Sequence, residues 1–390
     1  MNFLHLIYII IFFKSQILML PILYLFYIQN GLSWNDYFLF QGLSLLLNIF
    51  LQIPLGFISN FVSKKYYLII SCLFLIVSRL IWLFYSGYYA ILMGELIFSI
   101  SKSFYEIIEA PYLYEILKKY GKTSKMLQTY SQLNFFMWIS TGISGFISVG
   151  IYAITNFQIL MITEIVLFFT SLFFSFKLPN IKPKAKSCST CGLFPVTIGK
   201  ISIKLILSSA VLSAFSQFFF WSFQPILAIF SFPLTYFGWV IFINNIFRAF
   251  GCLANKYISQ LLTMKQMIKL CFLCTLFCFI FVIASKNYML FKQWCLILIF
   301  LLCISITIQL MFKIRVSTYL QNKASASMKT SLNTMHVFIT KLFTAILLIL
   351  PKYQQIDLGV FQIYNVYFCV FICFILLFFA FDRYNKQNYK

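Results

Sequence analysis

Apolar segments of about 20 residues recur roughly twelve times along this sequence, and no other feature limits its fold as strongly. A helix of that length crosses a hydrocarbon core of about 30 Å and satisfies its own backbone hydrogen bonds in lipid. Charged residues make up only 10% of the 390 residues, against about 25% in soluble domains, which excludes a water-soluble globular fold. We therefore predict an all-α membrane protein with twelve transmembrane helices, over residues 4–28, 37–59, 67–86, 89–115, 127–153, 157–177, 202–224, 235–256, 266–285, 293–313, 329–350 and 361–381.

Basic residues mark one side of the membrane. Cytoplasmic loops of membrane proteins carry an excess of Lys and Arg. When the spans alternate with the N-terminus inside, the outer connections contain only Lys286, Lys292 and Lys352. Both termini are thus predicted to be cytoplasmic. The net charge of +22 then reflects topology and contacts with membrane lipids rather than nucleic-acid binding.

One long polar segment divides the spans six and six. Residues 178–200 contain three prolines and several lysines, which disfavour a further span. We predict an N-terminal six-helix bundle over 1–177, a cytoplasmic central loop over 178–200, and a C-terminal six-helix bundle with a short tail over 201–390.

A short motif repeats across that division. Gly56 lies four residues before Asn60 at the inner end of the second span, and Gly251 lies four residues before Asn255 at the same end of the eighth. Lysines follow both copies, and Lys64 and Lys65 follow the first. Paired motifs in two halves are typical of transporters built from structural repeats.

Three segments resemble the major facilitator superfamily of transporters. Residues 52–65 resemble the family's loop between spans two and three, although Asn60 stands where the family has Asp and Ser63 where it has Gly. Residues 109–118 and 319–332 are similar to segments of a bacterial drug and metabolite branch, and the run after Tyr130 gives a weaker likeness to reduced-folate and thiamine carriers. The resemblance covers nearly the whole chain. It implies two six-helix pseudo-repeats around a central cavity, bordered by spans one, four, eight and eleven.

Acidic residues are scarce, and two of them lie together in the fourth span. Only eight Asp and Glu occur, and charged groups at membrane depth need partners, water or a task. Glu106 and Glu109 are three residues apart on one helix face, and Lys102 precedes Glu106 by one turn. We predict that Glu106 and Glu109 couple transport to protons. The alternative for Glu106 is a permanent ion pair with Lys102, and Glu115 is predicted to be structural.

A second group of charges lies nearer the outer ends of the spans. Arg79 and Glu95 are placed at matching depths on adjacent antiparallel spans, so we predict a structural ion pair between them. Glu164 has no evident partner, and both a structural role and a gating role stay open.

Four basic residues lie near the middles of the spans that border the predicted cavity, namely Lys14, Lys102, Arg248 and Lys341. With Glu106 and Glu109 they leave an excess of positive charge, which favours an anionic substrate. Arg248 is the best candidate to bind a carboxylate, because its guanidinium can donate two parallel hydrogen bonds. The alternative is that some of these cations pair with Glu164 or extend outward. Neutral contacts to the substrate are predicted from Gln132, Asn244 and Gln309.

These features predict a secondary transporter rather than an enzyme. The sequence has no nucleotide-binding motif or catalytic triad spacing, and we predict no cofactor and no metal site. We expect a monomer in the bacterial cytoplasmic membrane that moves a small organic, anionic or amphipathic solute by alternating access, with protons as coupling ion and efflux slightly favoured. The alternatives are a folate-like or thiamine-like vitamin importer and a non-transporting sensor or scaffold.

Overall fold

A computed structural model describes residues 3–59, 61–121, 125–181, 200–285, 292–323, 329–353, 367–368 and 370–372. Every regular element in these residues is helical. The helices are α1 (Phe3–Lys14), the 3-10 helix η1 (Leu20–Ile22), α2 (Leu23–Gln29), α3 (Trp34–Ile58), α4 (Lys64–Phe84), α5 (Tyr88–Lys119), α6 (Met126–Ile154), α7 (Phe157–Phe176), α8 (Lys200–Ile229), α9 (Leu234–Leu261), α10 (Met264–Ser285), α11 (Lys292–Lys323) and α12 (Lys329–Tyr353).

The helices match most of the predicted spans to within a few residues. In the described part of the chain, eight helices are long and apolar enough to cross a membrane. The helix α5 has 32 residues but carries Glu95, Lys102, Glu106 and Glu109 in its middle, which lowers its apolar character. Local signals set several helix starts. The Ser33 hydroxyl accepts from the Asp36 amide while the Asp36 carboxylate accepts from the Ser33 amide, a capping box at the start of α3.

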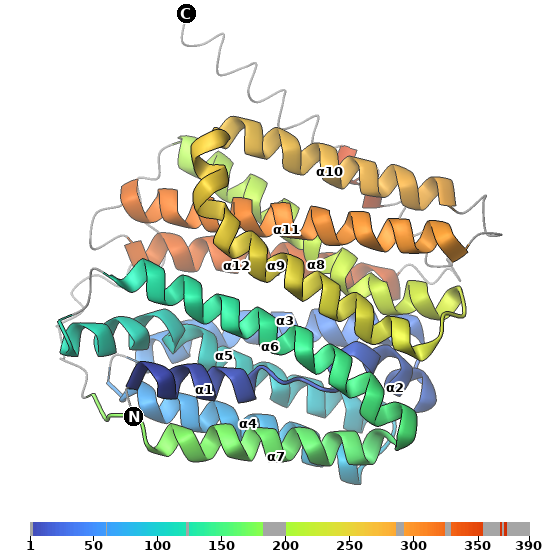
Figure 1. Ribbon diagram of the computed structural model, residues 1–390, viewed down its shortest axis with the longest axis horizontal. Coiled ribbons are helices and arrows are strands. Elements are labelled where there is room, and N and C mark those ends of the chain that lie inside the picture. Colours follow the sequence, from blue (N-terminus) through green and yellow to red (C-terminus); the bar gives the residue numbers. More distant parts are fainter. Residues whose placement is uncertain are drawn as a thin grey trace, which may run out of the picture.

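The first predicted span is not one helix. It divides into α1 and α2, with a non-helical stretch between Lys14 and Leu20 that Figure 1 shows as a thin connection. Side chains from distant helices satisfy the freed backbone groups. The Met19 amide donates to Glu164 at 3.3 Å, the Tyr24 amide donates to Gln224 at 2.8 Å, and Gln224 donates to the Leu20 carbonyl at 2.6 Å. Broken helices of this kind are tolerated in membranes only where such partners exist.

The tenth predicted span is longer than expected. The helix α11 continues to Lys323, so Lys313 and Arg315 lie within the helix instead of in a cytoplasmic loop. The predictions for Asn60, for most of the central loop and for most of the twelfth span lie outside the described residues.

Two groups of helices meet along two long contacts. Figure 1 shows α1–α7 in the lower part of the view and α8–α12 in the upper part, with most helix axes lying roughly along the horizontal of the view. The groups, called the N-half and the C-half below, join through α6 against α9 and α3 against α12. Glycines permit both contacts. A Cβ on Gly238 would lie 2.6 Å from the Gly145 carbonyl oxygen, and a Cβ on Gly42 would lie 2.4 Å from Ile349 Cγ1.

The two ends of the protein are packed differently. We call the end with residues 30–33, 85–87, 155–156 and 230–233 the outer end, and the opposite end the inner end. The largest apolar cluster joins both halves near the outer end, where Phe38 stacks on Phe218 and Tyr37 meets Trp221. A second cluster, at the inner end, contains N-half residues alone among those described. The halves are therefore closed on one another at the outer end.

Candidate functional site

An ion pair joins the two halves at mid-depth. Lys341 on α12 donates to Glu106 on α5 and to the Asn48 side-chain oxygen on α3. The Gln52 amide, one turn after Asn48, donates to Asn48 Oδ1 at 2.9 Å and to Glu106 Oε2 at 3.1 Å. The side chains of Glu106 and Lys341 are 36% and 15% exposed, so solvent reaches an ion pair that three helices surround. We call Asn48, Gln52, Glu106 and Lys341 the central cluster.

Further cations surround this cluster. Lys102 is exposed, one turn before Glu106 on α5, and lies within electrostatic range of Glu106 and Lys341. Lys313 on α11 lies within range of Glu106, Lys341 and Arg248. Three ammonium groups thus lie within electrostatic range of one carboxylate, which leaves an excess of two positive charges before Arg248 is counted. Because the cluster lies between low-dielectric walls, such an excess attracts anions strongly.

Arg248 is held between two aromatic rings. Its guanidinium carbon lies 4.7 Å from the Trp138 ring centroid on α6 and 4.7 Å from the Phe220 ring centroid on α8. No ion pair among the described residues includes Arg248, and the residue is 5% exposed. Stacking covers the faces of the guanidinium and leaves its edge N–H groups for hydrogen bonds.

Unsatisfied amides lie one turn from Arg248 on α9. Asn244 is fully buried, and neither its side-chain oxygen nor its nitrogen has a hydrogen-bond partner among the described residues. Asn245 donates to the Ile241 carbonyl at 2.9 Å, while its own oxygen lacks a described partner. Buried polar groups without partners are costly, so these amides mark a place where water or a ligand is expected. The substrate contact at Asn244 stays a prediction.

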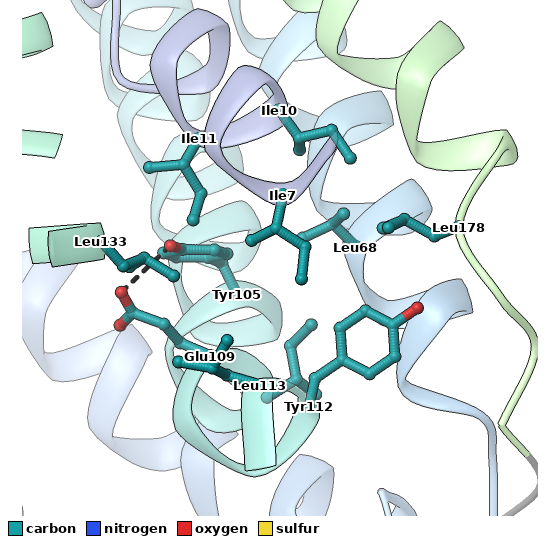
Figure 2. A pocket seen from close by; sticks show the side chains of 11 residues that line it. Ile7, Ile10, Ile11, Leu68, Tyr105, Glu109, Tyr112, Leu113, Leu133 and Leu178 are labelled. Atoms are coloured by element: carbon teal, nitrogen blue, oxygen red, sulfur yellow. Dashed lines mark hydrogen bonds between the residues drawn. The ribbon is translucent and has the colours of Figure 1, made fainter. Parts of the chain in front are cut away.

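Glu109 lies in a different environment from Glu106. It accepts a hydrogen bond from the Tyr105 hydroxyl at 3.1 Å, drawn as the dashed line in Figure 2. None of the ion pairs found in the described ranges includes Glu109. The residue borders a small apolar pocket between α1, α5 and neighbouring segments, and its carboxylate is the one acidic group among the described residues that line it.

Lys14 lies within electrostatic range of Glu109 and Glu106. Its ammonium donates to the Ser71 hydroxyl at 2.7 Å and lies 3.6 Å from the centroid of the Tyr105 ring. The residue is 8% exposed at the end of α1. The structure thus places this predicted substrate contact against α4 and α5 within the N-half.

The prediction of an Arg79–Glu95 ion pair is wrong, because Arg79 has a different acidic partner. Arg79 Nε lies 3.1 Å from Glu164 Oε1, and both side chains are almost fully buried. Glu95 instead accepts from the Tyr27 hydroxyl at 2.7 Å and from Gln41 at 3.1 Å. Both carboxylates lie at a depth that Arg79 can reach, and the rotation of the helices about their axes decides between them. Glu164, left open by the sequence, is this structural partner.

Two predicted amide contacts lie away from the central cluster. Gln309 donates to Thr275 at 2.6 Å and to Ser305 at 3.1 Å, which joins α10 to α11 inside the C-half. Gln132 is exposed and accepts from the Tyr8 hydroxyl at 3.2 Å. Gln309 thus has the position of a helix-joining residue.

In the N-half copy of the repeated motif, lysines hold the inner helix ends. Lys64 at the start of α4 forms an ion pair with Glu115 near the end of α5, and Lys65 donates to the Phe176 carbonyl at 2.6 Å. A Cβ on Gly56 would meet nothing within 4 Å. The N-half copy therefore ties α4 to α5 and α7, in agreement with the structural role predicted for Glu115.

In the C-half copy, the polar partner is an arginine from α11. Arg315 donates to the Asn255 side-chain oxygen and to the Leu262 carbonyl, each at 3.0 Å. A Cβ on Gly251 would lie 2.6 Å from Thr307 Cγ2, so α9 and α11 pack too closely for a larger residue. The repeat is therefore unequal, since only the C-half copy makes a tight helix contact.

Sequence reasoning missed several residues of the site. Asn48 and Gln52 are four residues apart on an otherwise apolar span, and this spacing was the available signal. Lys313 was placed at the very end of the tenth predicted span, because α11 was expected to end there and not at Lys323. The contact of Gln224 with the broken first span depends on the tertiary fold.

Comparisons with known proteins agree with this arrangement. No protein-family model matches the chain, and no curated protein matches it. Among solved structures, the crystal structure of a mutant form of nucleoside transporter NupG superimposes with a TM-score of 0.79 and 14% identity, covering 97% of this chain and 99% of that one. The crystal structure of NupG itself gives a TM-score of 0.74, with the same identity and coverage.

The chain has the fold of that transporter. This confirms the predicted all-α membrane architecture of the major facilitator type. Both similar structures are of a nucleoside transporter. They are not drug exporters or folate carriers, so the comparison supports the fold and neither of those two branches.

Proposed function

We propose that the protein is a secondary transporter that moves a small organic anion by alternating access between its two halves. The observation that carries this proposal is the central cluster. A carboxylate and two amides of the N-half lie at mid-depth with the Lys341 ammonium of the C-half, where solvent reaches them, and Lys102 and Lys313 lie within electrostatic range. An excess of positive charge in such a place favours an anion over a cation.

The packing supports a state closed at the outer end. Gln224 from the C-half binds the backbone of residues 20 and 24 in the N-half, and aromatic side chains fill the space around it. Rocking about the α6–α9 and α3–α12 contacts would open this end and close the other. If the lysine-rich end is cytoplasmic, as the sequence predicts, the conformation is inward-facing.

Proton coupling is part of the proposal, with Glu109 as the first candidate. Proton uptake by Glu106 would require the loss of its ion pair with Lys341, whereas Glu109 is bonded by a hydroxyl group. A transport cycle in which Glu109 exchanges a proton leaves the central cluster available for cargo. Efflux is the direction favoured by the resemblance found in the sequence.

A second candidate function is transport of a neutral nucleoside. The fold comparison favours it, because both similar structures are of nucleoside transporters. The aromatic rings around Arg248 and the unsatisfied amides of Asn244 and Asn245 would suit a flat heterocycle. The positive charge of the central cluster would then have no partner on the cargo.

Counterflow in proteoliposomes separates these functions. Vesicles preloaded with one unlabelled solute would be tested with adenosine 5′-monophosphate, adenosine, folate or thiamine as the labelled solute. Exchange of the monophosphate or folate, without exchange of adenosine or thiamine, supports the anion. Exchange of adenosine alone supports the nucleoside, and exchange of thiamine contradicts the charge argument. Binding without exchange is the result expected of a sensor.

A further inference from the structure

Two donors from different halves converge on one oxygen atom. Lys341 and Gln52 both donate to Glu106 Oε2, and Asn48 Oδ1 fixes the same two donors from the other side. Proteins bind carboxylates and phosphates through charge-assisted hydrogen bonds from N–H donors such as these. The central cluster is thus an oxyanion site, and its present occupant is a side chain of the protein.

Lys102 offers the Glu106 carboxylate a second cationic partner. Glu106 is 36% exposed, and Lys102 is exposed one turn earlier on the same helix. Residues four apart on a helix are neighbours and form ion pairs readily. No ion pair in the described ranges includes Lys102, whose ammonium lies 5.2 Å from the centroid of the Phe98 ring. Lys102 is therefore a cation to which the Glu106 carboxylate can move.

We propose that the anionic group of the cargo replaces Glu106 on Lys341 and Gln52, while Glu106 turns to Lys102. This inference rests on the proposed function and names its binding step. The exchange leaves neither Lys341 nor Lys102 without a counter-charge, because cargo pairs with Lys341 and Glu106 pairs with Lys102. The direct ion pair between the two halves is thereby replaced by a contact through the cargo, which binds both Lys341 of the C-half and Gln52 of the N-half. A neutral solute cannot drive it, so the site selects carboxylates and phosphates.

Titration of the purified protein tests the exchange. The unfolding temperature would be measured against adenosine 5′-monophosphate and inorganic phosphate, with adenosine as the neutral control. In Glu106→Gln the competing carboxylate is absent, so the half-saturating concentration of both anions is expected to fall by about tenfold. Glu106→Asp, whose shorter side chain reaches Lys341 less well, should change it in the same direction. Glu115→Gln removes an ion-paired carboxylate from the same helix outside the site and should leave it unchanged.

The outcomes separate this inference from the proposed function. The exchange is overturned if the unchanged protein binds the anions saturably while Glu106→Gln and Glu106→Asp bind them equally well or more weakly. The proposed anion transport is not affected by that result. An absence of saturable anion binding in all of these proteins overturns the anionic cargo and the exchange with it. Lys341→Gln should lose anion binding even when combined with Glu106→Gln, and retention of tight binding there would place the oxyanion site elsewhere.

Discussion

Lys341 on α12 and Glu106 on α5 form an ion pair that joins the C-half to the N-half at mid-depth. The contact α3–α12 brings the helices together, and Asn48 on α3 binds the same ammonium group. A movement of α12 relative to α5 would therefore break the contact of Lys341 with Glu106.

Loss of Lys341 should stop transport without unfolding the protein. Lys341→Gln removes the cross-half ion pair and the cation that we propose to bind cargo, so counterflow of the transported anion should fall at least about tenfold. Lys177→Gln is the control, because the Lys177 ammonium lies at the inner end of α7, over the rings of Phe173 and Phe174. Equal activity of the two variants would show that Lys341 is not part of the transport path.

The Arg79–Glu164 pair should be a major determinant of stability. Removal of one partner leaves a buried charge uncompensated, at a typical cost of about 3–5 kcal/mol. Glu164→Gln should therefore lower the unfolding temperature strongly, and Arg79→Met combined with Glu164→Leu should recover much of the loss. Glu95→Gln keeps the hydrogen-bonding shape of a side chain held by Tyr27 and Gln41 and should be milder. A larger effect of Glu95→Gln than of Glu164→Gln would contradict this assignment.

The two motif glycines should respond differently to alanine. A Cβ at position 251 would lie 2.6 Å from Thr307, and relief of that overlap should destabilise the protein by about 1–3 kcal/mol. Gly56→Ala meets nothing within 4 Å and should leave the unfolding temperature nearly unchanged. Thermal unfolding of both variants in the same detergent makes the comparison.

Gln224 should hold the outer end closed. Gln224→Leu leaves the Tyr24 amide and the Leu20 carbonyl without this partner, so the closed arrangement becomes less favourable. Gln29 and Thr235 are exposed positions of the two halves near this end. Spin labels at Gln29→Cys and Thr235→Cys would report the distance between the halves there. We expect a longer or broader distance distribution in the leucine variant. An unchanged distribution would assign closure to the aromatic packing alone.

The predicted orientation can be tested through native cysteines. Cys188 and Cys191 belong to the central loop that the lysine distribution places in the cytoplasm. A membrane-impermeant maleimide added to intact cells should therefore leave them unmodified and should modify Ser86→Cys, in the connection between α4 and α5. Labelling of the central loop from outside would reverse the orientation.

Sequence reasoning located the spans well because hydrocarbon imposes a strong local rule. Any segment in lipid must satisfy its own backbone, so an apolar run of sufficient length becomes a helix whatever its neighbours are. The same rule explains the failure at the first span. Residues 15–19 leave the helix where Glu164 binds the Met19 amide and Gln224 binds the backbone of residues 20 and 24, both from more than 140 residues away along the chain. No local pattern contains that information.

The charged residues of the site were identified by type and depth, and their partners were not. Glu106, Lys102, Lys341 and Arg248 were all found, because an ionisable group at membrane depth is unusual enough to be noticed. The sequence offered Lys102 as the partner of Glu106 and Glu95 as the partner of Arg79, and the structure gives Lys341 and Glu164. In both cases the predicted partner is near in sequence and the observed one comes from a distant helix.

The sequence by itself determined that this chain is a bundle of membrane-spanning helices with a surplus of positive charge in the interior, because hydropathy and charge are properties of each segment alone. Only the tertiary structure decided which charges meet, since that depends on the rotation of each helix and on the contact of two halves. Lys341 and Glu106 are 235 residues apart, and the packing of α3 against α12 brings them together.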